Sequence, residues 1–435
     1  MSPEFIGVLG MVAMLVLMFL GVHIGVTLAL VGIGGYAFIH GVDKSLTMAG
    51  MMPFSAIASY NMALFPVYLL LGELADVSGM MRDSFRAANI WVGNLRGGLA
   101  MASVVGGGLL AAVSGSSTAC SAILTKLSLP SLLEHKYQPK LATGALAAAG
   151  TLSNLIPPSI GLVIYAVMSE TSLGKLYIAT MVPGILLTLM FMIQIHIQCR
   201  LDPSLGPPGG STTLKQKVFG MKYAAPTVIL FMIVMGGIWF GVYTANEAGA
   251  VGAFGVFLYG LYRRTINGQS LTKAFKNCLS IAGMIFAVII SAEIFSNFVV
   301  ISGLSQALAR WVIGLNLSPV GVVICIMLVY IVVGTAMDTL TMILITLPFF
   351  IPLMNQLGID LVWFGILVVI QMELSQITPP VGLNLFVVAG MVKEKNISMG
   401  TVFSGAWPFC FTMVILNALI IIFPKIAMLL PNLMK

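Results

Sequence analysis

Two short polar motifs in this sequence combine residue types that can bind ions. Val113 to Thr118 reads VSGSST, and Gly334 to Thr339 reads GTAMDT. In such a turn the hydroxyl and carbonyl oxygens can bind a hard cation, and the free N–H groups can hold an anion. Small residues could instead serve only to let helices pack closely. Because both motifs interrupt apolar sequence, we favour ion binding.

Two further motifs place a proline pair inside an apolar segment. Leu152 to Pro158 reads LSNLIPP, and Leu374 to Pro380 reads LSQITPP. Each proline removes a backbone donor, so two in succession should break a helix. A simple kink would need only one proline. We therefore expect a broken helix at each motif, with exposed carbonyl groups near the bilayer centre.

Carboxylates within apolar sequence are the other candidates for chemistry. Asp338 lies in the second polar motif, and an unpaired carboxylate in a membrane is costly and generally marks an ion path or a structural partner. We expect Asp338 to take part in an ion site. Glu73, Glu293 and Glu373 could also carry protons or ions, but Glu73 and Glu293 occupy matching positions near predicted helix ends. For these three glutamates a structural role is favoured.

The composition defines the elements that must position these residues. Of 435 residues, 59% are hydrophobic and 8% are charged, whereas soluble domains carry roughly 25% charged residues. Apolar runs near the ~18 residues needed to cross a bilayer recur along the chain. The first, from Phe5 to Leu20, lacks a basic leader and a cleavage motif, so it is expected to be a retained span. The chain is predicted to be an all-α, polytopic membrane protein.

Other chemistries lack a motif. The five cysteines form no C-x-x-C pair, and the four histidines show no metal-ligand spacing. No Ser-His-Asp, Walker or GxGxxG context is present. The 21 Lys and Arg residues against 14 Asp and Glu residues give a net charge of +7, which in a membrane protein reports topology rather than nucleic-acid binding. We expect neither an enzyme nor an ATPase.

The chain divides into two similar halves. Gly21, Val31, Gly32 and Gly35 recur at one constant offset as Gly241, Val251, Gly252 and Gly255. We predict a first repeat over 1–198, a cytoplasmic linker over 199–222 and a second repeat over 223–435. Each repeat has one re-entrant hairpin, at 98–135 and 317–356, and one Pro-Pro-broken helix, at 141–170 and 361–392. The predicted membrane passes are 4–20, 22–40, 56–77, 141–170, 175–198, 223–242, 246–262, 276–300, 361–392 and 402–424.

Five passes in each half give the two repeats opposite orientations, as in many secondary transporters. The basic loops all fall on one side if the N-terminus is outside. They contain Arg82, Arg86, Arg96, Lys126, Lys136, Lys140, Arg263, Arg264, Lys393 and Lys395. Both termini are then predicted to be periplasmic. Non-helical backbone in a membrane must be buried in protein or line a water-filled cavity, so the hairpin tips should line a site.

Along nearly its whole length the chain resembles the large membrane (M) subunit of the TRAP (tripartite ATP-independent periplasmic) transporters, in the ion transporter superfamily. The residues that carry the resemblance are SGSSTACSA from Ser114, GTLSNLIPPSIGLVIY from Gly150, GTAMDTLTMILITLPFFIP from Gly334 and QITPPVGLNLFVVAGM from Gln376. The resemblance implies a Na⁺-coupled, elevator-type transporter in the bacterial inner membrane. It also implies two partners, a small four-helix membrane subunit (Q) and a soluble periplasmic substrate-binding protein (P).

The resemblance also implies two Na⁺ sites, bound largely through main-chain carbonyls, with the substrate between the hairpin tips. The first site would use Ser114, Gly115, Ser116, Ser117, Gly150, Thr151, Ser153 and Pro157. The second would use Gly334, Asp338, Thr339, Gln376, Thr378 and Pro379. A small organic anion would contact Ser116, Ser117, Asn154, Pro158, Thr335, Pro380 and Asn384.

The first hairpin departs from the family in one respect. Cys120 stands where an Asp often follows the serines, so this hairpin offers no side-chain carboxylate there. The tip motifs also contain no Arg or Lys, so an anion such as a carboxylate, sugar acid or sulfonate would be held by helix N-termini, amides, hydroxyls and bound Na⁺. An arginine from another segment remains an alternative. Two other functions stay open: a stand-alone ion-coupled anion carrier of a related inverted-repeat family, and a non-transporting scaffold or channel.

Overall fold

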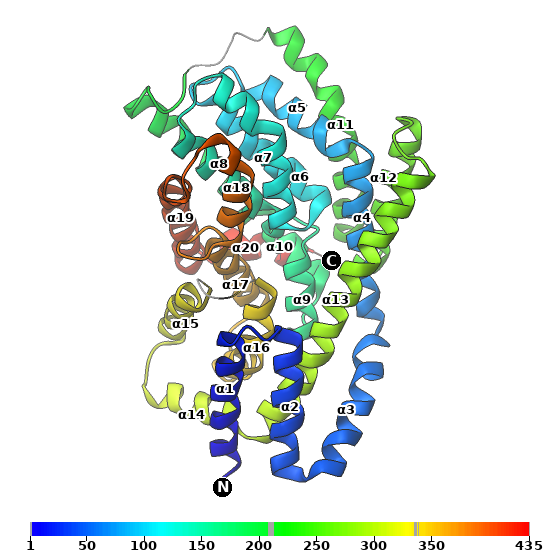
Figure 1. Ribbon diagram of the computed structural model, residues 1–435, viewed down its shortest axis with the longest axis vertical. Coiled ribbons are helices and arrows are strands. Elements are labelled where there is room, and N and C mark those ends of the chain that lie inside the picture. The colour runs from blue at the N-terminus through cyan, green and yellow to red at the C-terminus, as the bar shows by residue number, and fades with distance from the viewer. Residues whose placement is uncertain (1, 208–212, 335–336, 338, 435) are drawn as a thin grey trace.

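The computed structural model describes residues 2–207, 213–334, 337 and 339–434, except for the side chain of Asn61, and the described residues form helices and no strand (Figure 1). The helices up to the central linker are α1 (Pro3–Phe19), α2 (Ile24–His40), α3 (Val42–Ile57), η1 (Tyr60–Ala63), α4 (Leu64–Val77), α5 (Met80–Val92), α6 (Gly98–Ser114), α7 (Ser117–Glu134), α8 (Pro139–Leu155), α9 (Ile160–Ser169) and α10 (Leu173–Leu201).

The helices after the linker repeat much of this order. They are α11 (Leu214–Trp239), α12 (Ala245–Tyr262), α13 (Gly268–Ile301), α14 (Leu304–Gly314), α15 (Pro319–Gly334), α16 (Thr339–Gln356), α17 (Leu361–Gln376), α18 (Leu383–Val392), η2 (Lys393–Lys395), α19 (Met399–Ile422) and α20 (Lys425–Leu433). The sequence α6 to α10 therefore has a counterpart in α15 to α19: two helices joined by a short tip, two helices separated by Pro-Pro, and one long helix.

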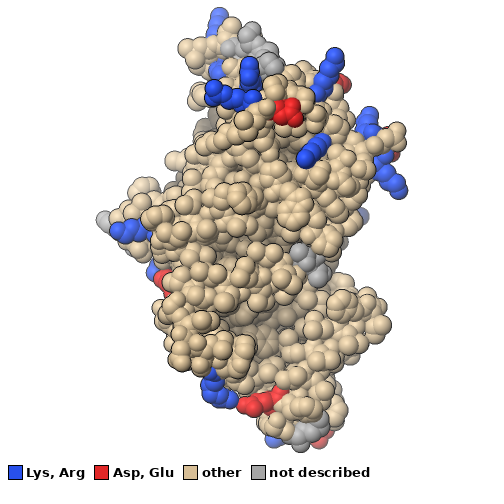
Figure 2. Space-filling view, turned by 90° about the vertical axis from the view of Figure 1, so that its left-hand side faces the viewer, with Lys and Arg blue, Asp and Glu red and all other residues tan. Residues whose placement is uncertain are grey.

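The prediction of an all-helical membrane protein is confirmed. Helices α10, α11, α13, α16 and α19 are long and apolar enough to cross a membrane. The pairs α4–α5 and α8–α9 meet the same test together, bent by 66° and 41°. Figure 2 shows Lys and Arg concentrated toward one end of the molecule and a broad uncharged surface across the middle. Such a surface suits contact with lipid.

Several predicted boundaries change in the structure. The predicted linker, 199–222, is shorter, because α10 continues to Leu201 and a capping box between Thr213 and Gln216 starts α11 before the apolar run. The pass predicted at 56–77 is split: α3 ends at Ile57 and α4 begins at Leu64. Helices α3, α5, α14 and α20 had no predicted counterpart. Helix α3 lacks an apolar run long enough to span, because Asp43, Lys44 and Pro53 interrupt it.

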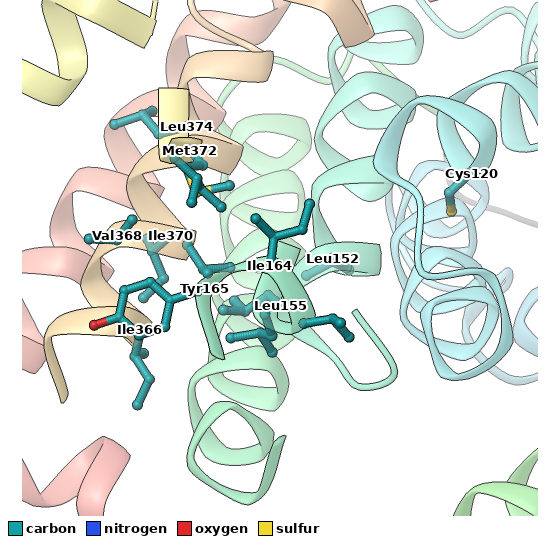
Figure 3. Packing of buried hydrophobic residues seen from close by; sticks show 14 of the residues in the cluster. Cys120, Leu152, Leu155, Ile164, Tyr165, Ile366, Val368, Ile370, Met372 and Leu374 are labelled. Atoms are coloured by element: carbon teal, nitrogen blue, oxygen red, sulfur yellow. The ribbon is translucent and has the colours of Figure 1, made fainter. Parts of the chain in front are cut away.

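The two helices that lead into the Pro-Pro motifs form the centre of the molecule. Every residue from Leu141 to Leu155 in α8 and from Val362 to Gln376 in α17 is buried. Figure 3 shows side chains of α8 and α9, among them Leu152, Leu155 and Tyr165, facing α17. The backbones of α8 and α19 touch, since a Cβ added at Gly144 would lie 2.1 Å from the Gly405 carbonyl oxygen. This packing leaves both breaks held on all sides.

Candidate functional site

The tip of the first hairpin is a tight turn between α6 and α7. Gly115 has φ +64°, a conformation that favours glycine. Ser116 then caps α7, since its Oγ accepts a hydrogen bond from the Ala119 backbone N–H at 3.4 Å. Ser114 Oγ donates to the Ser116 carbonyl oxygen at 3.5 Å. The sequence SGSS thus both turns the chain and starts the next helix.

The first break lies directly against this tip. Helix α8 ends at Leu155, the Pro157–Pro158 peptide is cis, and α9 begins at Ile160 with Ser159 as its cap. The backbone N–H of Ile160 donates to the Gly115 carbonyl oxygen at 3.4 Å. This bond joins hairpin and break through main-chain atoms.

Glycine lets the two elements approach even more closely one turn earlier. A Cβ added at Gly150 would lie 1.8 Å from Ser121 Oγ and 2.8 Å from the Ser117 carbonyl oxygen. The first group of predicted ion-site residues is therefore brought together around the α7–α8 contact. Two of its hydroxyl groups lie behind the tip: Thr151 and Ser153 are fully buried, and Thr151 Oγ1 donates to the Ala148 carbonyl oxygen at 2.7 Å.

The second hairpin and break form a matching unit. Gly334 ends α15 against α17, where an added Cβ would lie 2.4 Å from Ser375 Cβ. Gln376 Nε2 donates to Thr339 Oγ1 at the start of α16. Thr378 Oγ1 donates to the Leu374 carbonyl oxygen at 2.7 Å, and the Pro379–Pro380 peptide is cis. The predicted site residues Thr335 and Asp338 lie outside the described residues.

The same hydroxyl–amide pair occurs in both units. Ser117 and Asn154 are 37 residues apart and share a hydrogen bond of 3.4 Å between Oγ and Nδ2. Thr339 and Gln376 are also 37 residues apart and share the equivalent bond. In each unit the hydroxyl belongs to the first residue of the second hairpin helix, and the amide lies just before the Pro-Pro motif. Each bond therefore joins a hairpin tip to its break.

Both units line one cavity of about 310 Å³. Its polar walls come from the two tips and the two breaks, and α13 adds the apolar side chains of Ile281, Met284 and Ile285. No Lys, Arg or His is among the described residues that line it. From the described part of the prediction the lining includes Gly115, Ser116, Ser117, Asn154, Thr339 and Gln376.

The remaining predicted residues surround the cavity without lining it. Asn384 is completely buried in α18, and neither atom of its amide has a hydrogen-bond partner among the described residues. The lining does not include Ser114, Gly150, Thr151, Ser153, Pro157, Pro158, Gly334, Thr378, Pro379 or Pro380. These residues act, at most, through backbone atoms or as supports behind the cavity wall.

Four helices begin at this cavity. Ser117, Ile160, Thr339 and Leu383 are the first residues of α7, α9, α16 and α18, and all four line it. Helices α6, α8, α15 and α17 end at the same tips and breaks, at Ser114, Leu155, Gly334 and Gln376. Helix N-termini carry partial positive charge and C-termini partial negative charge. The arrangement can therefore attract an anion and cations at neighbouring points without any basic side chain.

One residue outside the predicted site contacts it directly. Glu373 in α17 is completely buried, and its Oε1 accepts hydrogen bonds from Asn154 Nδ2 at 2.7 Å and Ser117 Oγ at 3.4 Å. Sequence reasoning favoured a structural role for it, because no local pattern shows that α17 faces the first unit. The only sequence signal was its position three residues before Gln376.

The other carboxylates named from the sequence lie elsewhere. Glu73 accepts a hydrogen bond from Asn277 Nδ2 at 3.0 Å, between α4 and α13. Glu293 is half-buried on α13. Neither lines the cavity.

An all-helical, multi-pass chain with broken helices and hairpin tips around one polar cavity has the construction of a membrane transporter. The family model for the tripartite ATP-independent periplasmic transporter, DctM component, matches residues 11–426, so the chain belongs to this family.

Characterised relatives and solved structures agree with this assignment. The C4-dicarboxylate TRAP transporter large permease protein DctM of Pseudomonas aeruginosa is 33% identical over 380 residues, covering 87% of this chain and 88% of that protein. The sialic acid TRAP transporter large permease protein SiaM of Vibrio cholerae is 27% identical over 418 residues, covering 96% of each. The YdaH transporter of Alcanivorax borkumensis has a similar fold, with a TM-score of 0.66 at 16% identity over 87% of this chain and 89% of that one.

Proposed function

We propose that this chain is the large transmembrane subunit of a Na⁺-coupled, binding-protein-dependent TRAP system that imports a small organic anion. The observation that carries the proposal is the meeting of four helix N-termini, at Ser117, Ile160, Thr339 and Leu383, on one cavity. Aligned peptide dipoles there favour a negative charge. The relatives named for C4-dicarboxylates and sialic acid support an organic acid as substrate.

The size of the cavity supports a small substrate. A volume of about 310 Å³ lies at the lower end of the range for ligand pockets. Hydroxyl and amide groups from Ser116, Ser117, Asn154, Thr339 and Gln376 line it, and these groups can accept or donate hydrogen bonds to a carboxylate or sulfonate. A carboxylate, a sugar acid or a sulfonate is the proposed class.

Two Na⁺ ions are proposed at the helix C-termini. The ends of α6 and α8 lie beside the first tip, and the ends of α15 and α17 lie beside the second. Their last carbonyl groups have no partner within the helix and carry partial negative charge. The residues of the two predicted sites supply these carbonyls and the nearby hydroxyl groups. The bound Na⁺ would then offset the charge of the anion.

The repeated order of elements supports an inverted-repeat, elevator-type mechanism. In this proposal the two hairpin–break units, within repeats 1–198 and 223–435, move together as one body. Helix α13 walls the cavity but packs mainly on α2, α3 and α4, so it would belong to the stationary part. The chain would lie in the bacterial inner membrane with both termini in the periplasm, and it would work with a small four-helix subunit and a periplasmic binding protein.

Reconstitution tests the proposal. Proteoliposomes containing this chain with its small subunit should take up a C4-dicarboxylate, a sugar acid or a sulfonate only when Na⁺ and the cognate binding protein are present outside. Uptake should disappear when choline replaces Na⁺. Robust uptake by this chain alone would contradict the proposal and favour a stand-alone carrier. Uptake that needs the binding protein but not Na⁺ would contradict only the coupling ion.

A further inference from the structure

Glu373 occupies a position in which a carboxylate is costly unless something compensates it. The side chain is completely buried in α17. An ionised carboxylate away from water needs hydrogen bonds and a counter-charge. The ion pairs among the described residues are Arg263 with Asp83 and Arg310 with Glu4, so neither involves Glu373. Its compensation must come from something other than a described basic side chain.

The hydrogen bonds of Glu373 are those of an acceptor. Oε1 receives the Asn154 amide at 2.7 Å and the Ser117 hydroxyl at 3.4 Å. Oε2 is buried and has no hydrogen-bond partner among the described residues. An ionised carboxylate accepts and never donates, whereas a neutral carboxylic acid needs an acceptor for its O–H group. The surroundings therefore suit the charged form, with one oxygen left for a further ligand.

The groups around the carboxylate suit a hard cation. The hydroxyl group of Ser117 and the side-chain oxygen of Asn154 are both within one side chain of Glu373, and the Ser117 carbonyl lies in the α7–α8 contact at Gly150. Oxygen atoms of these kinds are the ligands that hard cations take. Within the described residues no cluster of three His, Cys, Asp or Glu side chains could hold a metal ion. A monovalent cation, which needs few charged ligands, fits this set.

We propose that Glu373 supplies the side-chain charge for a Na⁺ ion held beside Ser117 and Asn154 at the first hairpin. The first cation site then uses residues of both halves of the chain, because α17 belongs to the second half and α7 and α8 to the first. The inference rests on the proposed Na⁺ coupling. It also gives that coupling a physical basis: a buried negative charge next to the cavity repels an anionic substrate until a cation neutralises it.

The test compares two glutamates that both accept a hydrogen bond from an asparagine. Glu373→Gln removes the charge and keeps the shape, and Glu73→Gln does the same at the Asn277 contact outside the cavity. Each variant is purified with its small subunit, and its melting temperature is measured as Na⁺ replaces choline at constant ionic strength. We expect the Na⁺ concentration for half-maximal stabilisation to rise at least tenfold in Glu373→Gln and to stay unchanged in Glu73→Gln.

A second pair of variants separates charge from shape. Glu373→Asp keeps the charge on a shorter side chain and should recover part of the Na⁺ response, whereas Glu373→Ala should recover none. If Glu373→Gln does not fold, Glu373→Asp carries the test, since a shifted ligand should still raise the half-maximal Na⁺ concentration severalfold. Uptake assays on the same variants should show the same order of Na⁺ dependence.

The outcomes distinguish the inference from the proposed function. An unchanged Na⁺ midpoint in the folded Gln variant, or in the Asp variant where only that one folds, would overturn the role of Glu373 and leave Na⁺ coupling intact. A wild-type protein with no Na⁺ response in melting or uptake would refute Na⁺ coupling itself. A raised midpoint in Glu73→Gln equal to that in Glu373→Gln would also overturn the inference, because the effect would then not be local to the cavity.

Discussion

The first and second hairpin–break units share a plan but differ in how they are held. Both join a hydroxyl to an amide 37 residues later, Ser117 to Asn154 and Thr339 to Gln376. Only the first pair also receives a carboxylate, that of Glu373. The residue three positions before Asn154 is Thr151, whose hydroxyl group bonds to its own helix instead. Two units can therefore be alike in fold and unlike in charge.

The packing of the two units differs as well. Gly150 lets α8 lie directly on α7, whereas α17 carries the buried Met372 two residues before Leu374 and packs less extensively on α16. Small residues permit backbones to approach within a membrane, and large ones hold them apart. The first unit is thus a close backbone contact, and the second depends more on side chains.

The largest expected effect comes from breaking the close contact of the first unit. Gly150→Leu would drive its Cβ into Ser121 and the Ser117 carbonyl, and overpacking costs about 1–3 kcal/mol or more. We expect loss of folded protein, measured as a missing monodisperse peak in size-exclusion chromatography. Gly236→Ala in α11 is the control, since a Cβ there meets nothing within 4 Å. A well-folded Gly150→Leu variant would show that the α7–α8 contact is not needed.

The next effect concerns the second unit. If Asp338 belongs to the second Na⁺ site, Asp338→Ala should abolish Na⁺-dependent uptake while the protein still folds, because the site would lose its charged ligand. Uptake into proteoliposomes and the melting temperature measure the two properties separately. Unchanged uptake would refute the role predicted for Asp338.

The two amides should differ in importance if the carboxylate matters. Asn154→Ala removes a hydrogen bond to a charged group, worth about 1.5–3 kcal/mol, and should lower uptake efficiency at least about tenfold. Gln376→Ala removes a bond between neutral groups, worth about 0.5–1.5 kcal/mol, and should lower it about two- to tenfold. Initial uptake rates over a range of substrate concentrations measure both. Equal losses would remove the distinction between the units.

The smallest effect is expected at Thr151. Its hydroxyl group is already bonded to the Ala148 carbonyl oxygen within α8, so Thr151→Val should change uptake and the Na⁺ midpoint by about twofold or less. A shift comparable to that of Glu373→Gln would instead identify the Thr151 hydroxyl as a Na⁺ ligand.

Much of the fold could be predicted because its signals are local. Gly115 and the serines around it specify a turn and a helix cap, and two prolines in succession specify a break, whatever surrounds them. The residues of the tips and breaks were therefore identified from the sequence, and the structure brings many of them to one cavity.

What the sequence could not provide were contacts between distant elements. Ile281, Met284 and Ile285 of α13 line the cavity, but apolar residues on a membrane helix look the same whether they face lipid or a site. Glu373 was underestimated for a similar reason, since its partners are 219 and 256 residues away. Only the packing of α17 on α8 shows that it reaches the first unit.

The reach of Glu373 into the opposite half also bears on the ancestry of the chain. The similar halves suggest a gene duplication, after which each copy would have been able to stand in for the other. A protein made of two first halves would now have Thr151 where the carboxylate is needed, and Asn154 and Ser117 would lose their shared acceptor. The two halves have become specialised to each other, and neither can be replaced by a second copy of its sister.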